Sequence, residues 1–465
     1  MTSTMLRAGW QQLRLHLLPA ALILFFGAIY AQYALKIKHS DHGMRSAFLR
    51  WKIQLEDLDH GINVWEKYAY PNPPIMALIL KPFLQQPPIL GSALWFCCKA
   101  LLAMASILGV LSLLDSPQHR FPPWGKALAV LMSLRPIEGD LVHGNVNLLI
   151  LFLLVATLWT FWRRWNWLTG LFLGLSIACK LTPALFLFYF LWKGAWKVLF
   201  SAAAGLLVFV LLLPAVAFGW SNNLQYLRSW HQQMVAPYAA GVVTSEHKNQ
   251  SLPGLLHRML CEEASFSDYE GERKIVLETH NLCNWDPDTV RGIVMACMAL
   301  FTLLAVRICR APWWREGEAP SEPPENWLGG SLAIPKTSFQ DGRLQLLAEF
   351  SVVALGMLLF CERTWKHHCV TLLLPFSVLA FCLSAGLFSR GLRWYVGITL
   401  TLAALLMLST STGVYDQQTD AQDRIGKLAQ VYGAYVWAFL LLLAAMFVVL
   451  SKCRLSGSKP DSPAR

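Results

Sequence analysis

The feature that most constrains this chain is a series of apolar runs, several of them long enough to cross a lipid bilayer. The first covers residues 15–35 and the last covers residues 432–450. A helix needs about 20 mainly apolar residues to cross the hydrocarbon core, where only helices and closed barrels satisfy all their backbone groups. Because 55% of the chain is hydrophobic and only 14% is charged, the sequence predicts an all-α polytopic integral membrane protein.

The formal net charge of +11 is spread over short connectors between the apolar runs. The basic positions include Arg7, Arg14, Arg120, Lys126, Arg163, Arg164, Lys193, Lys197, Arg307, Arg390, Arg393, Lys452 and Arg454. Cytoplasmic loops of membrane proteins carry such an excess of Lys and Arg. We therefore expect no nucleic-acid partner, and we place these connectors and both chain termini in the cytoplasm.

With the basic connectors on one side, alternation of the apolar runs predicts about 11–13 transmembrane helices. Two long segments, residues 36–89 and 219–290, then become extracytoplasmic loops of a membrane domain at residues 1–310. A cytoplasmic linker at 311–343, C-terminal transmembrane helices at 344–455 and a disordered tail at 456–465 complete the expected organisation. The apolar segment at 73–82 is too short to cross and is predicted to be a helix at the outer surface.

In this topology, polar side chains that no membrane helix needs cluster in five segments on the outer face. The candidates are Asp41, Asp57 and Asp59 in the first outer loop; His143, Asn145 and Asn147 in "RPIEGDLVHGNVN"; Lys180 in "CKLTP"; Asn249 and Gln250 in "HKNQSLPGLL"; and Arg363, His367 and His368 in "CERTWKHHCVTLLLPF". Ionisable groups at a membrane boundary are functional candidates by default. We expect these segments to share one cavity that opens away from the cytosol.

The residue types in these segments favour glycosyl transfer from a lipid phosphate. A carboxylate can remove the proton from an attacking hydroxyl, and Lys and Arg can bind a phosphate whose charge grows as a bond breaks. Carboxamides suit sugar hydroxyls because they donate and accept hydrogen bonds at once. The rival hypotheses are a transporter or flippase, which would carry charges near mid-span, and a lipid-linked oligosaccharide polymerase or ligase.

Five stretches occur in the order found in glycosyltransferase family 87, and the chain resembles that family from about residue 41 to residue 375. They read "YAYPNPPIMALILKPFL", "HGNVNLLILFLLV", "GLFLGLSIACKLTPALFLFYFL", "KNQSLPGLL" and "TWKHHCVTLLLP". The usual Gly-Gln-x-Asn of the family is Gly144-Asn145-Val146-Asn147 here. The resemblance implies a GT-C-type membrane fold and transfer of a hexose, typically mannose, from a polyprenyl-phosphate donor.

The resemblance also assigns roles to single residues. It implies that Asp41 is the catalytic base of an inverting displacement, that Lys180 and Arg363 stabilise the departing polyprenyl phosphate, and that Asn249 and Gln250 contact substrate. The expected acceptor is a glycan or glycolipid of the cell envelope, and the expected location is the plasma membrane. The sequence indicates no certain cofactor, and a divalent cation is left open.

Each candidate also has a structural alternative. Asp57 and Asp59, the second choice for the base, fit an acidic loop end; the turn residues His143, Asn145 and Asn147 fit a helix cap; and Lys180 fits a side chain reaching the headgroups. His367 and His368 lie about 100° apart on an α-helix, so at most one of them is expected to face the cavity beside Arg363, which could instead pair with Glu362.

Two further expectations concern the outer loops. Met44, Phe48, Trp51, Leu55 and Leu58 recur at helical spacing, which predicts an amphipathic surface helix after Asp41. The second loop contains Cys261 and Cys283, which are either a disulfide, permitted by an outward location, or two unrelated thiols. We find no spacing of the His-x-x-x-His type and predict no metal site.

Overall fold

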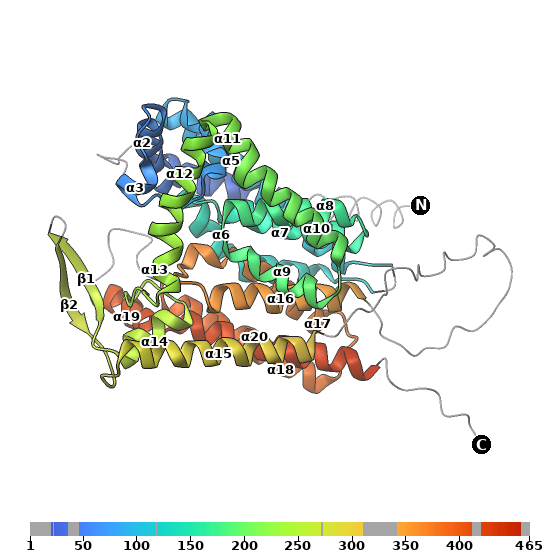
Figure 1. Cartoon of the computed structure of the whole chain (residues 1–465). Helices are drawn as coiled ribbons and strands as arrows, with labels where there is room; N and C mark the ends of the chain where they lie inside the picture. The colour runs from blue at the N-terminus through green and yellow to red at the C-terminus, as the bar shows by residue number, and fades with distance from the viewer. Residues whose placement is uncertain are drawn as a thin grey trace, which may run out of the picture.

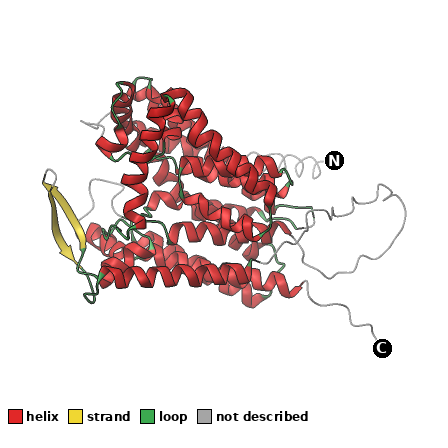
Figure 2. Ribbon diagram, in the orientation of Figure 1, coloured by secondary structure: helices red, strands yellow, loops and turns green. Residues whose placement is uncertain are grey.

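The computed structural model describes residues 20–21, 23–35, 46–117, 119–270, 273–309, 342–411 and 420–456. The predicted base Asp41, residues 311–341 of the predicted linker and residues 457–465 of the predicted tail lie outside the described residues. The described chain is a bundle of helices with a single β-hairpin at one end (Figures 1 and 2).

An apolar helix at Ile23–Leu35 precedes the labelled elements. The first half of the bundle consists of α2 (Ala47–Asp59), α3 (Val64–Tyr68), α4 (Pro74–Leu84), α5 (Pro88–Leu114), α6 (Pro123–His143), α7 (Asn147–Trp162), α8 (Asn166–Cys179), the 3₁₀ turn η1 (Thr182–Ala184), α9 (Leu185–Trp192), α10 (Trp196–Leu206), the π-helical η2 (Leu207–Leu212) and α11 (Leu213–Phe218).

The second half contains α12 (Trp220–Trp230), the π-helical η3 (His231–Val235), α13 (Ala236–Ala239), α14 (Leu252–Leu260), β1 (Ala264–Glu270), β2 (Arg273–Thr279), α15 (Pro287–Ile308), α16 (Gly342–Leu359), the 3₁₀ helix η4 (Lys366–Leu372), α17 (Leu373–Ser384), α18 (Arg390–Ser409), α19 (Asp420–Val431) and α20 (Ala434–Ser456).

The predicted all-α polytopic membrane fold is confirmed. Among the described residues, seven helical stretches are long and apolar enough to cross a bilayer: Pro88–Leu114, Trp196–Phe218, Pro287–Ile308, Gly342–Leu359, Lys366–Ser384, Arg390–Ser409 and Ala434–Cys453. Shorter apolar helices such as α7 and α8 lie between them. The number of helices that cross the membrane therefore stays a prediction.

The centre of the bundle is formed by α16 and by η4 with α17. In each of these two stretches 83% of the apolar window is buried inside the molecule, whereas the corresponding share of α15 is 17%. A helix that is apolar all round must be covered on every side, either by other helices or by lipid. We infer that α16 and α17 are covered by protein and that α15 presents most of its surface to lipid.

Close helix contact in the first half depends on small residues. Gly170 and Gly174 on α8 face α10, and a Cβ at Gly170 would lie 2.6 Å from the backbone nitrogen of Ala202. Small residues four apart let two membrane helices approach at backbone distance. This contact holds α8, and with it the segment that follows Cys179, against α10.

Consecutive helices run in opposite directions, so the short turns between them lie at two opposite ends of the helices. α7 starts at Asn147 and ends before Arg163 and Arg164, and α8 returns from there to Cys179. α9 then leads back toward Lys193. The basic turns therefore lie at the end of these helices opposite to Asn147 and Lys180.

The predicted amphipathic helix after Asp41 is present as α2. Phe48, Trp51, Leu55 and Leu58 are buried, as their helical spacing predicts. The short apolar segment at 73–82 is also helical, as α4.

The second outer segment, predicted as a loop, contains three helices and the hairpin. β1 pairs antiparallel with β2 from Ala264 opposite Thr279 to Glu270 opposite Arg273, with irregular register near Phe266. The hairpin escaped the sequence prediction because its two strands have no clean alternation of apolar and polar side chains.

A buried arginine ties this outer segment to the C-terminal helices. Arg258 on α14 is fully buried. Its guanidinium donates to the carbonyl of Val431 at 2.7 Å and, through other nitrogens, to the carbonyls of Ser245, Glu246, Asn249 and Gln430. One side chain thus holds α14, the preceding loop and the turn between α19 and α20 together.

We expect Arg258→Met to destabilise the protein by at least about 3 kcal/mol, because each buried carbonyl left without a donor costs about 1–3 kcal/mol. The matched control is Arg291→Met, since Arg291 is exposed and donates to the carbonyls of Ala239 and Ala240; this change should cost less than about 0.5 kcal/mol. Thermal unfolding in detergent measures both. Equal unfolding midpoints for the two variants would contradict the proposed role of Arg258 in holding these segments together.

Candidate active site

A cavity of about 830 Å³ lies between the ends of several helices and the outer segments. Its walls come from α2, the α6–α7 turn, the α8–α9 junction, η3 and the segment between α16 and η4. Six predicted substrate-binding residues line it: His143, Asn145, Lys180, Arg363, His367 and His368. Segments far apart in the sequence therefore share one cavity.

The charged groups of the cavity wall are mostly cationic. Among the described lining residues, Arg50, Lys180 and Arg363 carry positive charge, and Glu362 is the only carboxylate. Such a wall suits an anionic ligand, since cations bind phosphate through charge-assisted hydrogen bonds. One carboxylate beside three cations is a poor donor set for a divalent cation, which prefers several oxygen ligands.

The α6–α7 turn carries three of the predicted residues into position. α6 ends at Gly144, which adopts a left-handed conformation (φ 76°) that favours glycine. The Trp95 indole donates to the Gly144 carbonyl at 3.1 Å, and the Asn145 side chain accepts from the Val146 backbone N–H at 2.7 Å. The turn is therefore held by Trp95 on α5 and by the Asn145 side chain within the turn.

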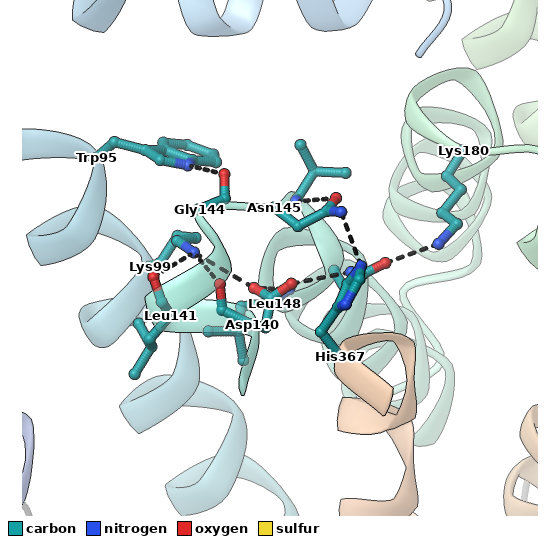
Figure 3. A network of polar contacts seen from close by, with 11 residues as sticks. Trp95, Lys99, Asp140, Leu141, Gly144, Asn145, Leu148, Lys180 and His367 are labelled. Atoms are coloured by element: carbon teal, nitrogen blue, oxygen red, sulfur yellow. Dashed lines mark hydrogen bonds and ion pairs between the residues drawn. The ribbon is translucent and has the colours of Figure 1, made fainter. Parts of the chain in front are cut away.

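A chain of polar contacts runs from this turn to Lys180 (Figure 3). The Lys180 ammonium donates to the side-chain oxygen of Asn147 at 2.7 Å, and the Asn147 amide donates to the Asp140 carboxylate at 2.9 Å. The other Asp140 oxygen lies 3.5 Å from the Lys99 ammonium and 3.4 Å from the Leu148 backbone nitrogen. Lys99 and Asp140 are fully buried.

This chain explains how Lys180 can keep its charge available for a ligand. The hydrogen-bond partner of Lys180 is a neutral amide, whereas the Asp140 carboxylate is balanced by Lys99. Asp140 accepts from the Asn147 amide nitrogen and thereby turns the amide oxygen toward Lys180. Asn147, predicted to contact substrate, borders a small neighbouring pocket and holds Lys180 instead of lining the main cavity.

The wall segment between α16 and η4 is fixed by the second outer segment. The Asn249 amide donates to the Glu362 carbonyl at 2.8 Å, and its side-chain oxygen accepts from the Thr364 N–H at 3.0 Å. The backbone N–H of Gln250 donates to the Thr364 carbonyl at 2.7 Å. Both side chains are fully buried.

Asn249 and Gln250 therefore lie behind the cavity wall and do not line the cavity, contrary to the contact that the family resemblance implied. The Gln250 side chain donates to the carbonyls of His247 and Gln430 and accepts from the Tyr435 N–H. All these partners are backbone groups. The structure assigns both residues a positioning role.

Both adjacent histidines line the cavity, whereas helical spacing predicted at most one. They lie in the first turn of the 3₁₀ helix η4, and this turn forms part of the cavity wall. His367 Nε2 lies 3.1 Å from the Asn145 amide nitrogen and therefore acts as an acceptor, and its ring stacks on His143 at 4.3 Å. The Nδ1 atom of His368 lies 3.1 Å from the Arg363 carbonyl.

Glu362 and Arg363 form the ion pair that the sequence suggested, at 3.1 Å. Burial raises the pKa of Glu362 above its ordinary value, and Arg363 opposes this shift. The Arg363 side chain is about half exposed toward the cavity, at 51%. It is thus held by Glu362 and still accessible to a ligand.

The second-choice carboxylates lie outside the cavity lining. Asp57 accepts hydrogen bonds from Lys67 and from the Tyr68 hydroxyl, each at 2.6 Å, and these bonds lower the pKa of Asp57. A carboxylate with a lowered pKa is a weaker base. Asp59 pairs with Lys81 at 2.6 Å. In the structure both act as partners of surface lysines.

Sequence reasoning missed several polar residues of the wall, namely Arg50, Gln54, Asn72, Gln233 and Tyr238. Arg50 and Gln54 lie on α2, where their place on the polar face indicated only contact with water. Glu362 was considered only as an ion-pair partner. The signal in the sequence that could have marked Glu362 as a cavity residue was its position directly before Arg363 and close to two histidines.

Cys261 and Cys283 are both free thiols in the structure, so the possible disulfide is not formed there. Cys261 is buried near the end of α14, close to His257 and Glu263. These residues do not line the main cavity.

The fold and the cavity are those of an integral membrane enzyme with a cationic site beside apolar walls. The family model described as Glycosyltransferase family 87 matches residues 70–323. This match covers more than half of the chain, and the chain belongs to that family. The resemblance inferred from the sequence motifs is confirmed, and the protein is a membrane glycosyltransferase.

Two curated relatives carry the same description, polyprenol-phosphate-mannose-dependent alpha-(1-2)-phosphatidylinositol mannoside mannosyltransferase. The protein of Mycolicibacterium smegmatis is 27% identical over 394 residues, covering 82% of this chain and 76% of its own. The protein of Mycobacterium tuberculosis is 33% identical over 168 residues, covering 33% of this chain and 38% of its own. No solved structure matches the chain.

The contact chain in Figure 3 predicts different roles for its two lysines. Lys99→Met should destabilise the protein by about 3–5 kcal/mol, because it leaves the buried Asp140 carboxylate without its cation. Lys180→Met leaves the oxygen of the buried Asn147 amide without its donor and should cost less, about 1–3 kcal/mol. Thermal unfolding in detergent measures both variants.

A double variant provides the control. Lys99→Met with Asp140→Asn removes both buried charges and should recover most of the stability that Lys99→Met loses. No recovery in the double variant would show that Lys99 contributes through packing or through its hydrogen bonds to the Asp140 and Leu141 carbonyls, and not through its charge pair with the Asp140 carboxylate.

Proposed function

We propose that the protein transfers mannose from a polyprenyl-phosphate mannose donor to a glycolipid or glycan acceptor. The observation that carries this proposal is the convergence of Arg50, Lys180 and Arg363 in one cavity whose remaining wall is largely apolar. Both curated relatives are described as dependent on polyprenol-phosphate-mannose and as acting on a phosphatidylinositol mannoside. These descriptions support the donor and a glycolipid acceptor.

The cavity wall matches the two parts of such a donor. Near the cations, the phosphate would be bound by charge-assisted hydrogen bonds. Apolar side chains from η3, α9, α15 and α16 form another part of the wall and suit the polyprenyl chain: Val235, Leu185, Met298 and Met357. Because α15 has little protein around it, a lipid could reach the cavity from that side.

The proposed reaction is a single inverting displacement. The base takes the proton of the acceptor hydroxyl, and the hydroxyl oxygen forms a bond to the anomeric carbon of the donor. The bond from that carbon to the phosphate oxygen breaks, and polyprenyl phosphate leaves with the electron pair. Lys180 and Arg363 stabilise the charge that develops on the phosphate.

The ion pair of Glu362 argues against Glu362 as the base. In an inverting displacement the base must lie on the face of the sugar opposite to the leaving phosphate. Glu362 is paired with Arg363, which is proposed to hold that phosphate, so Glu362 lies on the phosphate side. We therefore retain Asp41 as the proposed base and assign Glu362 the role of orienting Arg363.

Substitution of the two carboxylates tests this assignment. Asp41→Asn should lower the transfer rate by about 10²–10⁴-fold, the usual contribution of a general base, whereas Glu362→Gln should lower it by less than about tenfold. Purified protein, radiolabelled polyprenyl-phosphate mannose and a phosphatidylinositol mannoside acceptor provide the measurement. The reverse order of effects would transfer the role of base to Glu362.

We further propose that the cavity faces the extracytoplasmic side of the plasma membrane. The support is the placement of Arg163, Arg164 and Lys193 at the helix ends opposite to Asn147 and Lys180, since basic turns favour the cytoplasm.

Cysteine labelling in intact cells tests this orientation. Gln85→Cys lies in the first outer segment and Lys197→Cys at the start of α10, and both positions are exposed. An impermeant maleimide should label Gln85→Cys in intact cells and should label Lys197→Cys only after the membrane is opened. The parent protein, with its native cysteines, gives the background. The opposite pattern would overturn the proposed orientation.

A further inference from the structure

A second cluster of reactive side chains lies at the end of α14, away from the main cavity. The side-chain ligand atoms of His257, Cys261 and Glu263 all lie within 4.8 Å of one another. His257 and Cys261 are buried, and Glu263 is partly buried. We propose that these three residues, with Cys283 as the fourth ligand, bind a transition-metal ion of the Zn²⁺ class.

The local backbone brings the three ligands to one side of the helix end. His257 and Cys261 are four residues apart, and the Cys261 N–H donates to the His257 carbonyl at 2.9 Å, so one helical turn stacks their side chains. The Glu263 N–H donates to the Cys261 carbonyl at 2.9 Å, and this tight turn directs Glu263 back toward His257.

The spacing of the ligand atoms is compatible with a tetrahedral zinc site. Zinc bonds of about 2.0–2.3 Å place two ligand atoms roughly 3.3–3.8 Å apart. The distance from His257 Nδ1 to Glu263 Oε1 is 3.3 Å. Cys261 Sγ lies within 4.8 Å of both atoms, so it needs to move by at most about 1 Å to complete the three ligands.

The proposed fourth ligand, Cys283, lies in the segment that follows the hairpin. The Leu282 N–H donates to the Met259 carbonyl at 2.7 Å, and the Trp285 N–H donates to the Leu260 carbonyl at 2.6 Å, so the residues around Cys283 lie beside the end of α14. Its thiol is outside the group formed by His257, Cys261 and Glu263 and must move toward them when the metal binds. A site with two thiols, one imidazole and one carboxylate selects zinc-like ions over Mg²⁺ or Ca²⁺.

Such an ion would act on structure and not on the transfer reaction, since none of its ligands lines the main cavity. It would fasten the segment before α15 to α14. The same helix carries Arg258, and the loop before it carries Asn249, which positions the cavity wall. This inference does not depend on the proposed sugar donor.

Metal analysis of the purified protein tests the site. The full-length chain, purified through a histidine-free affinity tag, is loaded with Zn²⁺, dialysed and measured by inductively coupled plasma mass spectrometry. We expect about one zinc ion per chain for the wild type and less than about a tenth of that for Cys261→Ser and for His257→Gln. Cys97→Ser, which changes an exposed thiol on α5, is the matched control and should retain the zinc.

A spectroscopic measurement on the wild type covers the case in which the variants do not fold. Co²⁺ loaded in place of Zn²⁺ should give a thiolate-to-metal charge-transfer band in the near ultraviolet. Absence of both the zinc and this band in the folded wild type would overturn the proposal. A Cys261–Cys283 disulfide found by mass spectrometry without reductant would overturn it as well.

Discussion

The buried ion pair between Lys99 and Asp140 is the interaction on which the candidate site depends. Both side chains are inaccessible to solvent, and a lone buried charge costs several kcal/mol, so neither can change without affecting the other. The pair also leaves one Asp140 oxygen for Asn147, which in turn orients Lys180. A cation at the cavity is thus held by an amide, and its charge is not cancelled by a neighbouring carboxylate.

The opposite wall of the cavity depends on the second outer segment. Asn249 and Gln250 fix the segment that carries Glu362 and Arg363, and Arg258 fixes the loop that carries Asn249. Most of these hydrogen bonds are accepted by backbone carbonyls. They therefore fix the path of the partner segment, whatever side chains that segment carries. A family motif such as "KNQSLPGLL" can therefore be essential for the site without any of its residues contacting the substrate.

Some features of the site could be predicted because they depend on residue type and local spacing. The amphipathic pattern of Phe48, Trp51, Leu55 and Leu58 predicted α2, and Lys180 between two apolar runs predicted a functional cation at a helix junction. The predicted limit of one histidine in the cavity failed because it considered only the directions of two side chains on a helix, whereas the cavity wall runs along the chain from Phe360 to His368 at the start of η4. Arg50 could not be found, since its neighbours in the cavity belong to segments distant in the sequence.

By itself, the sequence determined the class of fold and the family, because apolar run length, the placement of basic turns and ordered motifs are local properties of the chain. Only the tertiary structure decided which polar residues face the cavity. Asn145 and Asn147 are two positions apart, yet one contacts His367 and the other contacts Lys180 and Asp140. Their roles depend on which distant side chains pack against each of them, and local spacing does not encode that information.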